Sequence, residues 1–234
     1  MTIQFRDDVT VELVKANATD QDVAMAARVS TLGLDAADSD RPIEGLINFL
    51  ARDRHGSPFE HASMTFRVHA PIVVAREAFR HRAGWSYNEA SGRYMELKPV
   101  FYVPSRRRNL TQVGKPGQYR FKPGSAFQHF VSRHAHMLPY RAAWLAYKVM
   151  LKVGIAREVA RNVLPVGIYT TWYATCNSRS LMHFLGLRTI DERAKFPSFP
   201  QQEIEMVAGG MEDHFAELMP ITHEAYNRNG RVAP

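Results

Sequence analysis

Cysteine and long apolar segments are largely missing from this chain. Its 234 residues include one cysteine, Cys176, which excludes an internal disulfide framework and indicates a reducing compartment. The longest stretch without charge, residues 162–178, is interrupted by Pro165 and Gly167 and is not predicted to cross a bilayer. The N-terminal residues MTIQFRDDVTVEL contain two acids where a signal peptide needs an apolar run. We therefore expect a cytoplasmic protein with no membrane partner.

Acidic residues are also outnumbered. The chain has 30 Lys and Arg against 23 Asp and Glu, for a formal net charge of +7. This charge favours anionic partners but does not distinguish nucleic acid from nucleotides or phosphorylated cofactors. Hydrophobic residues at 45% and charged residues at 23% are ordinary globular values. No internal repeat or linker is evident, so the sequence predicts a single domain over residues 1–234.

The periodicity of the chain predicts helices and strands without a regular βαβ alternation. The clearest strand is residues 62–70, in which apolar and polar side chains alternate. The expected strands are residues 10–16, 62–70, 94–104 and 167–177. The expected helices are residues 19–30, 41–53, 71–83, 126–153, 155–165, 178–190 and 201–218. This pattern predicts an α+β fold, a single mixed domain with an antiparallel or mixed sheet packed by helices.

Particular residues set the expected boundaries. Thr19 or Asp20 is suited to cap the first helix, and Pro42 to occupy the first turn of the second. Gly84 is expected to end the helix that starts near residue 71, so residues 85–93 are predicted to form a loop.

Residues 103–124 contain six basic residues, three glycines, three prolines and no acid. This composition predicts a basic loop insertion rather than a folded layer. It also leaves open an alternative function, in which the chain binds nucleic acid through this loop. No recognisable nucleic-acid-binding motif supports that alternative, so nucleic acid is not the expected partner.

Residues 79–94, FRHRAGWSYNEASGRY, concentrate positive charge around one carboxylate, Glu89. The cationic side chains are Arg80, His81, Arg82 and Arg93. A basic helix end would be stabilised by the helix dipole whatever its function. That explanation does not cover Ser91 and Arg93, which follow in a turn-rich segment. Guanidinium groups and hydroxyls together suit phosphate or carboxylate ligands, so an anion site is predicted.

Residues 54–61, RHGSPFEH, raise the question of a metal site. His55, Glu60 and His61 are all possible ligands, but their spacing matches no strong zinc pattern and no thiolate accompanies them. Ser57 and Glu60 are more simply explained as local capping groups of a turn. No metal site is therefore expected.

Residues 157–188 contain two further basic pairs at helical spacing, Arg157 with Arg161 and Arg179 with His183. Asn177 precedes the second pair, where free backbone N–H groups could receive an anion. A solvated basic helix face explains the same pattern, and these residues alone do not decide between the two. Cys176 lies on the apolar face of a predicted strand, which indicates a buried structural thiol rather than a nucleophile.

Four segments in order resemble the flavin-dependent thymidylate synthases. They are HGSPFEH, the helix and signature APIVVAREAFRHR with S…SGRY, then REVARNVLP, and NSRSLMHFLGLR. Together they cover most of residues 54–188 apart from the basic loop. The resemblance implies a mixed α/β fold and a homotetramer whose active sites are shared between subunits.

The resemblance also implies ligands and residues for them. FAD would be bound by Ser57, Glu60, Arg80, His81, Arg82, Glu89, Asn177, Arg179 and His183. The substrate dUMP would be bound by Glu77, Arg80, Ser91, Gly92, Arg93, Arg161 and Arg188. NADPH would reduce the flavin, 5,10-methylenetetrahydrofolate would donate the carbon, and no protein nucleophile would take part. Arg188 is the implied catalytic residue, because a fixed cation beside the uracil would stabilise developing negative charge.

The chain departs from the family pattern in three places. Eight residues, rather than seven, separate the Arg80–Arg82 triplet from Ser91. Glu77 stands where glutamine is common, and the histidine often found shortly after Arg188 is missing.

Overall fold

The computed structural model describes residues 2–36, 41–115 and 118–234, which pack into two compact units. Unit 1 is drawn from Met1–Val9, His69–Ala78 and Glu89–Trp172, and unit 2 from Thr10–Val68, Phe79–Asn88 and Tyr173–Pro234. The chain is a mixture of helices and strands, as predicted. The prediction that it forms a single domain remains a prediction.

The main sheet has the strand order β2-β3-β8-β4. These strands are β2 (Thr10–Asn17), β3 (Ser63–Pro71), β8 (Tyr169–Asn177) and β4 (Trp85–Glu89). The alternation in β3 has the predicted consequence: Met64, Phe66 and Val68 are buried, while Arg67 is exposed. The sequence pattern therefore identified the core face of this strand correctly.

Unit 1 is built around a long helix, α4 (Ala126–Lys152), which starts with a capping box between Ser125 and Gln128. Tyr140, Trp144 and Tyr147 of α4 form a buried cluster with Phe101 and other apolar side chains. Phe101 belongs to β5, which pairs in parallel with β1. The other elements are β1 (Gln4–Arg6), α3 (Ile72–Ala78), β5 (Val100–Tyr102), β6 (Asn109–Val113), β7 (Arg120–Pro123), α5 (Arg157–Ala160) and the 3-10 turn η3 (Arg161–Val163).

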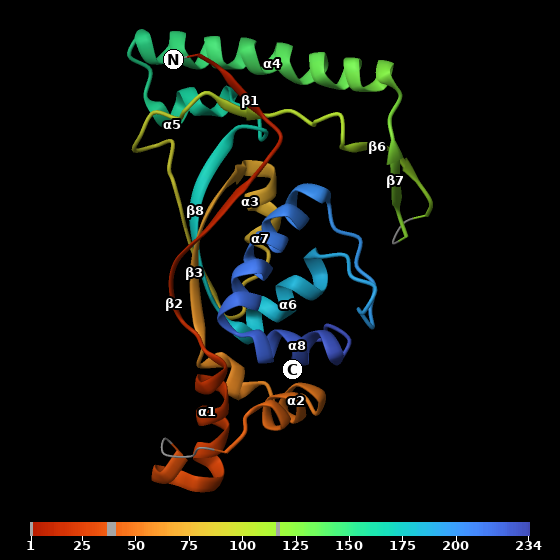
Figure 1. The fold of residues 1–234 in the computed structure, drawn as a ribbon. Coiled ribbons are helices and arrows are strands. Elements are labelled where there is room, and N and C mark those ends of the chain that lie inside the picture. Colours follow the sequence, from red (N-terminus) through yellow and green to blue (C-terminus); the bar gives the residue numbers. More distant parts are fainter. Residues whose placement is uncertain (1, 37–40, 116–117) are drawn as a thin grey trace. The chain divides into compact units, whose positions relative to one another are not determined.

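Unit 2 contains most of the remaining helices. They are α1 (Asp20–Leu32), η1 (Gly33–Ala36), α2 (Glu44–Arg52), η2 (Ser57–Glu60), α6 (Ser178–Arg188), α7 (Gln202–Leu218) and α8 (Pro220–Arg228). Helices α6, α7 and α8 gather together, and α7 packs along β2 (Figure 1). The predicted cap at Thr19 is confirmed, since its side chain accepts a hydrogen bond from the N–H of Asp22. Asp20 in turn accepts hydrogen bonds from the first N–H groups of α8, at Ile221 (3.0 Å) and Thr222 (2.8 Å).

A buried ion network holds the end of α6 to α7 and α8. Arg231 is 4% exposed, and its guanidinium donates to Glu212 at 2.6 and 2.8 Å. It also donates to Asn227 (2.7 Å) and to Thr189 (2.8 Å), the residue after Arg188. The network therefore fixes the backbone position from which the Arg188 side chain extends.

Several expected boundaries are wrong. Residues 85–89 form strand β4 rather than loop, because their backbone joins the main sheet, which the polar composition of the segment does not reveal. Helix α3 ends at Ala78, so Arg80 lies beyond it, and Phe79 packs its ring on Tyr87 at 4.7 Å between centroids. Helix α2 begins at Glu44, so Pro42 is not in its first turn.

The basic segment is also more ordered than predicted. Within residues 103–124, β6 and β7 pair as an antiparallel hairpin, and residues 116–117 lie outside the described residues. Gly114 has φ +100°, a conformation that favours glycine in the turn. Helix α8 was not predicted; it follows α7 after a single residue, Met219. In the part of the chain that is described, no helix has the length and apolar character to cross a membrane.

Candidate functional site

The residues predicted to bind ligands fall into two groups. Unit 2 contains Ser57, Glu60, Arg80, His81, Arg82, Asn177, Arg179, His183 and Arg188. Unit 1 contains Glu77, Glu89, Ser91, Gly92, Arg93 and Arg161.

A cavity of about 410 Å³ in unit 2 collects four of the predicted residues: Glu60, Asn177, Arg179 and His183. Its other lining residues are Ala83, Gly84, Ser180, Ala233 and Pro234. Helix α6 provides part of the wall, because Arg179, Ser180 and His183 occupy its first turns. Asn177 caps this helix, with its side-chain oxygen accepting from the N–H of Ser180 at 2.8 Å. The cavity thus opens at a capped helix N-terminus that carries the Arg179 guanidinium.

Arg179 is held in place by two hydrogen bonds. Its Nη1 donates to Glu60 Oε1 at 2.5 Å, and its Nε donates to the main-chain oxygen of Pro234 at 2.6 Å. Both Arg179 and Glu60 have side chains 45% exposed, so this ion pair adds little to stability. The ion pair orients the Arg179 guanidinium at the edge of the cavity, where this group could bind an anion.

Two glycines allow the backbone to approach residues that line this cavity. Gly84 has φ +69°, and a Cβ there would overlap Ser180 Oγ and lie 2.9 Å from Asn177 Nδ2. A Cβ on Gly56 would lie 2.5 Å from Arg179 Nε. A methyl group at either position would therefore force residues that line the cavity to shift.

Arg188 and His81 form a direct pair at the other end of α6. Arg188 Nε donates to His81 Nε2 at 3.1 Å, so that nitrogen must be unprotonated. Burial of the ring, together with Arg188 and His183, lowers the pKa of His81 to about 4. His81 is consequently neutral at pH 7 and holds Arg188 without cancelling its charge.

Aromatic residues that the sequence did not single out form a series of ring contacts that begins at His81. The Phe184 ring lies edge-on to His81 at 4.8 Å, and Trp85 lies 5.4 Å from Phe184. Tyr87 stacks on Trp85 with an interplanar angle of 3°. The spacing of Trp85 and Tyr87 places them on one face of a strand, a signal that the predicted loop obscured.

Unit 1 brings the SGRY residues to Arg161. The hydroxyl of Ser91 accepts from the N–H of Arg93 at 3.3 Å, and a Cβ on Gly92 would lie 3.2 Å from Arg161 Cδ. Arg93 Nε donates to Glu158 Oε2 at 3.1 Å. Ser91, Gly92, Arg93 and Arg161 are thus neighbours, as the resemblance implies, and Glu158 is a partner that it did not include.

The remaining predicted residues are less closely tied to these groups. Ser57 begins η2, Glu89 ends β4 and Glu77 lies in α3. Arg80 and Arg82 are exposed beyond the end of α3.

Cys176 is buried, as predicted, with 2% of its surface exposed, and burial raises the pKa of its thiol. A thiol in this environment is a poor nucleophile. Across the described residues, no three His, Cys, Asp or Glu side chains are grouped so that they could hold a metal ion.

Comparison with known proteins gives one consistent result. The sequence pattern of the family described as "thymidylate synthase complementing protein" matches residues 12–221. The chain is 61% identical over 236 residues to a flavin-dependent thymidylate synthase of Streptomyces coelicolor, covering 99% of this chain and 96% of that protein. It is 52% identical over 234 residues to the enzyme of that name from Tropheryma whipplei, covering 98% and 97%.

Solved structures agree. The fold matches a UMP/dUMP methylase, PolB from Streptomyces cacaoi, in a crystal structure with 5-Br UMP, with TM-score 0.93, 52% identity and full coverage of both chains. A second structure of that protein, with 5-Br dUMP, matches with TM-score 0.94 and 53% identity over 99% of this chain and 100% of the other. None of these relatives is named as binding nucleic acid, so the nucleic-acid alternative has no support. The chain is an enzyme that belongs to the flavin-dependent thymidylate synthase family.

Proposed function

We propose that the enzyme methylates dUMP reductively to dTMP, with 5,10-methylenetetrahydrofolate as the carbon donor and FAD reduced by NADPH as the hydride source. The observation that carries this proposal is the cavity at the start of α6, with Gly84 in its lining and its oriented Arg179, in the same unit as the Arg188–His81 pair. Family membership and the nucleotide analogues in the PolB structures support the same substrate class.

The unit 2 cavity fits the demands of a dinucleotide cofactor. Gly84 and Gly56 let Asn177, Ser180 and Arg179 lie close to the backbone, and Arg179 offers a guanidinium to a pyrophosphate. When bound, FAD would supply hydride transfer, which no amino-acid side chain provides. The residues proposed to hold it are Ser57, Glu60, Arg80, His81, Arg82, Glu89, Asn177, Arg179 and His183.

For dUMP, the residues around the SGRY turn have the required chemistry. The Ser91 hydroxyl accepts one hydrogen bond and keeps its proton for donation to a phosphate oxygen. Arg93 and Arg161 supply guanidinium groups near this turn, and Gly92 lets the Arg161 side chain pack closely against the backbone. Glu77, Arg80 and Arg188 complete the proposed dUMP set.

Arg188 would act on the uracil ring electrostatically. Because His81 is neutral, the pair retains a full positive charge, aimed by the hydrogen bond between them. A preoriented cation beside the N3–C4–O4 edge would stabilise the negative charge that develops as C5 attacks the one-carbon unit. No protein nucleophile is required, in accord with the burial of Cys176.

The overall reaction balances. One dUMP, one methylenetetrahydrofolate, one NADPH and one proton would give dTMP, tetrahydrofolate and NADP⁺. The hydrogen at uracil C5 leaves as a proton, and the transferred methylene group gains a hydride to become the methyl group.

We also propose that the enzyme is a homotetramer, supported by an apolar stripe on α4. Its members are Phe127, Val131, Leu138, Leu145 and Val149, with exposures between 45% and 73% in the single chain. An exposed apolar surface of this kind is typical of a subunit interface.

The test is formation of dTMP from dUMP, followed by liquid chromatography and mass spectrometry. Complete mixtures contain FAD, NADPH and methylenetetrahydrofolate, and each is omitted in turn. With enzyme freed of flavin, product is expected only in the complete mixture, and product without FAD, or none at all, would refute the proposal. UMP is tested in parallel because the PolB structures include a UMP analogue. Methylation of UMP but not of dUMP would reassign the substrate.

A further inference from the structure

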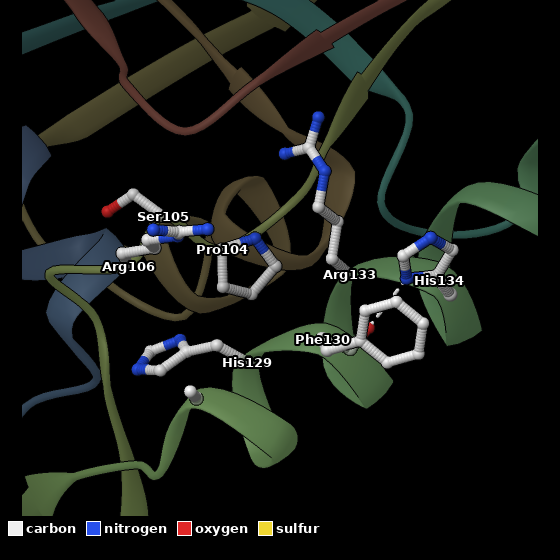
Figure 2. Close-up of a pocket in the computed structure, with 8 residues that line it drawn as sticks. Pro104, Ser105, Arg106, His129, Phe130, Arg133 and His134 are labelled. Atoms are coloured by element: carbon white, nitrogen blue, oxygen red, sulfur yellow. Dashed lines mark hydrogen bonds between the residues drawn. The ribbon is translucent and has the colours of Figure 1, made fainter.

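Unit 1 contains a cavity of about 390 Å³ that the proposed function does not use. One wall is the loop Pro104–Arg106, and the other is the start of α4, with Ala126, His129, Phe130, Arg133 and His134. Figure 2 shows the side chains of Arg106, His129 and Arg133 around this hollow, with Phe130 and His134 beside them. A volume of this size is at the lower end of small-molecule sites.

The wall provided by α4 continues the core face of the same helix. From Arg133, steps of three and four residues lead through Met137 to Tyr140, Trp144 and Tyr147, which pack in the unit 1 core. The same face thus changes from apolar core residues to arginine and histidine where the cavity begins. The apolar stripe of α4 follows different positions, so the cavity and the proposed subunit contact occupy different faces.

The charge around this cavity has one sign. Its lining includes Arg106, Arg133, His129 and His134 and no carboxylate. Among the described residues, no ion pair to Arg106 or Arg133 is formed, whereas Arg108 nearby donates to Asn109 O and covers the Phe121 ring. Two guanidinium groups therefore face a shared hollow without a protein anion to neutralise them.

Polar and aromatic groups complete the lining. The Ser105 hydroxyl accepts from the N–H of Arg107 at 3.3 Å, which leaves its proton for another acceptor. His134 donates from Nδ1 to Phe130 O at 2.8 Å, and the two rings pack at 4.1 Å between centroids. The Phe130 ring is 59% exposed and offers a face for a planar group.

We propose that this cavity binds the diphosphate group of a nucleotide. Arg106 and Arg133 would each bind phosphate oxygens from opposite walls, with Ser105 donating a further hydrogen bond. The base or sugar would lie against Phe130. None of its lining residues belongs to the sets proposed for FAD and dUMP, and the site gives the basic segment that starts at Arg106 a ligand-binding role.

Calorimetric titration of the full-length enzyme, saturated with FAD and dUMP, tests the proposal with pyrophosphate and ADP as probes. Both are expected to bind, and Arg133→Gln or Arg106→Gln is expected to weaken both by at least about tenfold. Arg107→Gln is the matched control, since it removes one exposed charge from the same loop outside the cavity lining. Its affinities should stay within about twofold of wild type.

Two results would overturn the inference. One is the absence of binding of either probe to the wild-type enzyme. The other is an equal loss in Arg107→Gln and Arg133→Gln, which would indicate general charge attraction. Phe130→Ala should weaken the binding of ADP but not that of pyrophosphate. An ADP affinity equal to that of wild type would refute the proposed contact of the base or sugar with Phe130. The titrations are repeated without FAD and dUMP, so that binding at this cavity is tested whether or not the proposed reaction is correct.

Discussion

Replacing Gly84 with alanine should damage the proposed FAD cavity through two separable effects. The first is backbone strain, because Gly84 has φ +69° and a left-handed conformation costs a residue with a Cβ about 1–2 kcal/mol. The second is overlap of the new Cβ with Ser180 Oγ and its 2.9 Å approach to Asn177 Nδ2. Overpacking of this kind typically adds about 1–3 kcal/mol. The expected loss in unfolding free energy is therefore about 2–5 kcal/mol.

Gly154 provides the matched control. Its φ is +85°, but a Cβ there would have no atom within 4 Å, so Gly154→Ala carries the strain without the overlap. That variant should lose about 1–2 kcal/mol of unfolding free energy and keep its affinity for FAD. Urea denaturation measures the first quantity, and flavin fluorescence titration measures the second.

The cavity effect should appear in the flavin titration. Gly84→Ala displaces Asn177 and Ser180, and FAD should bind at least about tenfold more weakly, equivalent to one lost hydrogen bond of about 1.4 kcal/mol. Gly84→Ala/Ser180→Ala removes the overlapping oxygen and should recover part of that affinity. Equal FAD affinity in Gly84→Ala and Gly154→Ala would refute the assignment of this cavity to FAD.

Three further predictions concern other parts of the chain. Cys176→Ala should form dTMP at close to the wild-type rate. In the wild-type protein the buried Cys176 thiol should resist a disulfide reagent until the protein unfolds. Rapid modification of this thiol with loss of activity would contradict its structural role. Burial opposes ionisation of Glu212, but hydrogen bonds from His223 and Arg231 outweigh it and lower its pKa to about 2. This folded-state pKa is below the ordinary value of 4.5, so the carboxylate contributes stability above pH 4.5 that is lost as the pH falls towards 2. This contribution to the unfolding free energy is about 3 kcal/mol. In Glu212→Gln the unfolding free energy should therefore fall less steeply than in wild type between pH 5 and pH 3. An unchanged slope would count against the network. Leu145→Asp should dissociate the proposed tetramer, as measured by the mass in light scattering, whereas Leu34→Asp, at a site 98% exposed, should leave it intact. A monomeric wild-type protein would contradict the proposed interface.

Local pattern was sufficient to predict some elements. The alternation in β3 identified a face whose residues are buried, and the polar residue before α1 identified its cap. The alternation of Cys176 with Trp172 and Ala174 correctly indicated a buried thiol. In each case the residues that decide the structure are close together in sequence.

Other features depend on partners that are distant in sequence. Strand β4 is stabilised by its pairing in the main sheet. Without knowledge of that pairing, its polar residues 86 and 88 are typical of a loop. The His81–Arg188 hydrogen bond joins residues separated by 107 positions. Family resemblance assigned both residues to ligands, but neither their contact nor the neutral state of His81 could be read from spacing. The β6–β7 hairpin was missed because the glycines, prolines and basic residues of residues 103–124 were interpreted as a loop.

Release of tritium from [5-³H]dUMP tests the central claim most directly, because it reports loss of the C5 hydrogen for which Arg188 is proposed to prepare the uracil. Arg188→Ala should retain FAD, as judged by flavin fluorescence, and lose release by at least about a hundredfold. Arg52→Ala, which removes an exposed arginine paired with Asp53, should release tritium at the wild-type rate. Wild-type release from Arg188→Ala with FAD bound would contradict the mechanism.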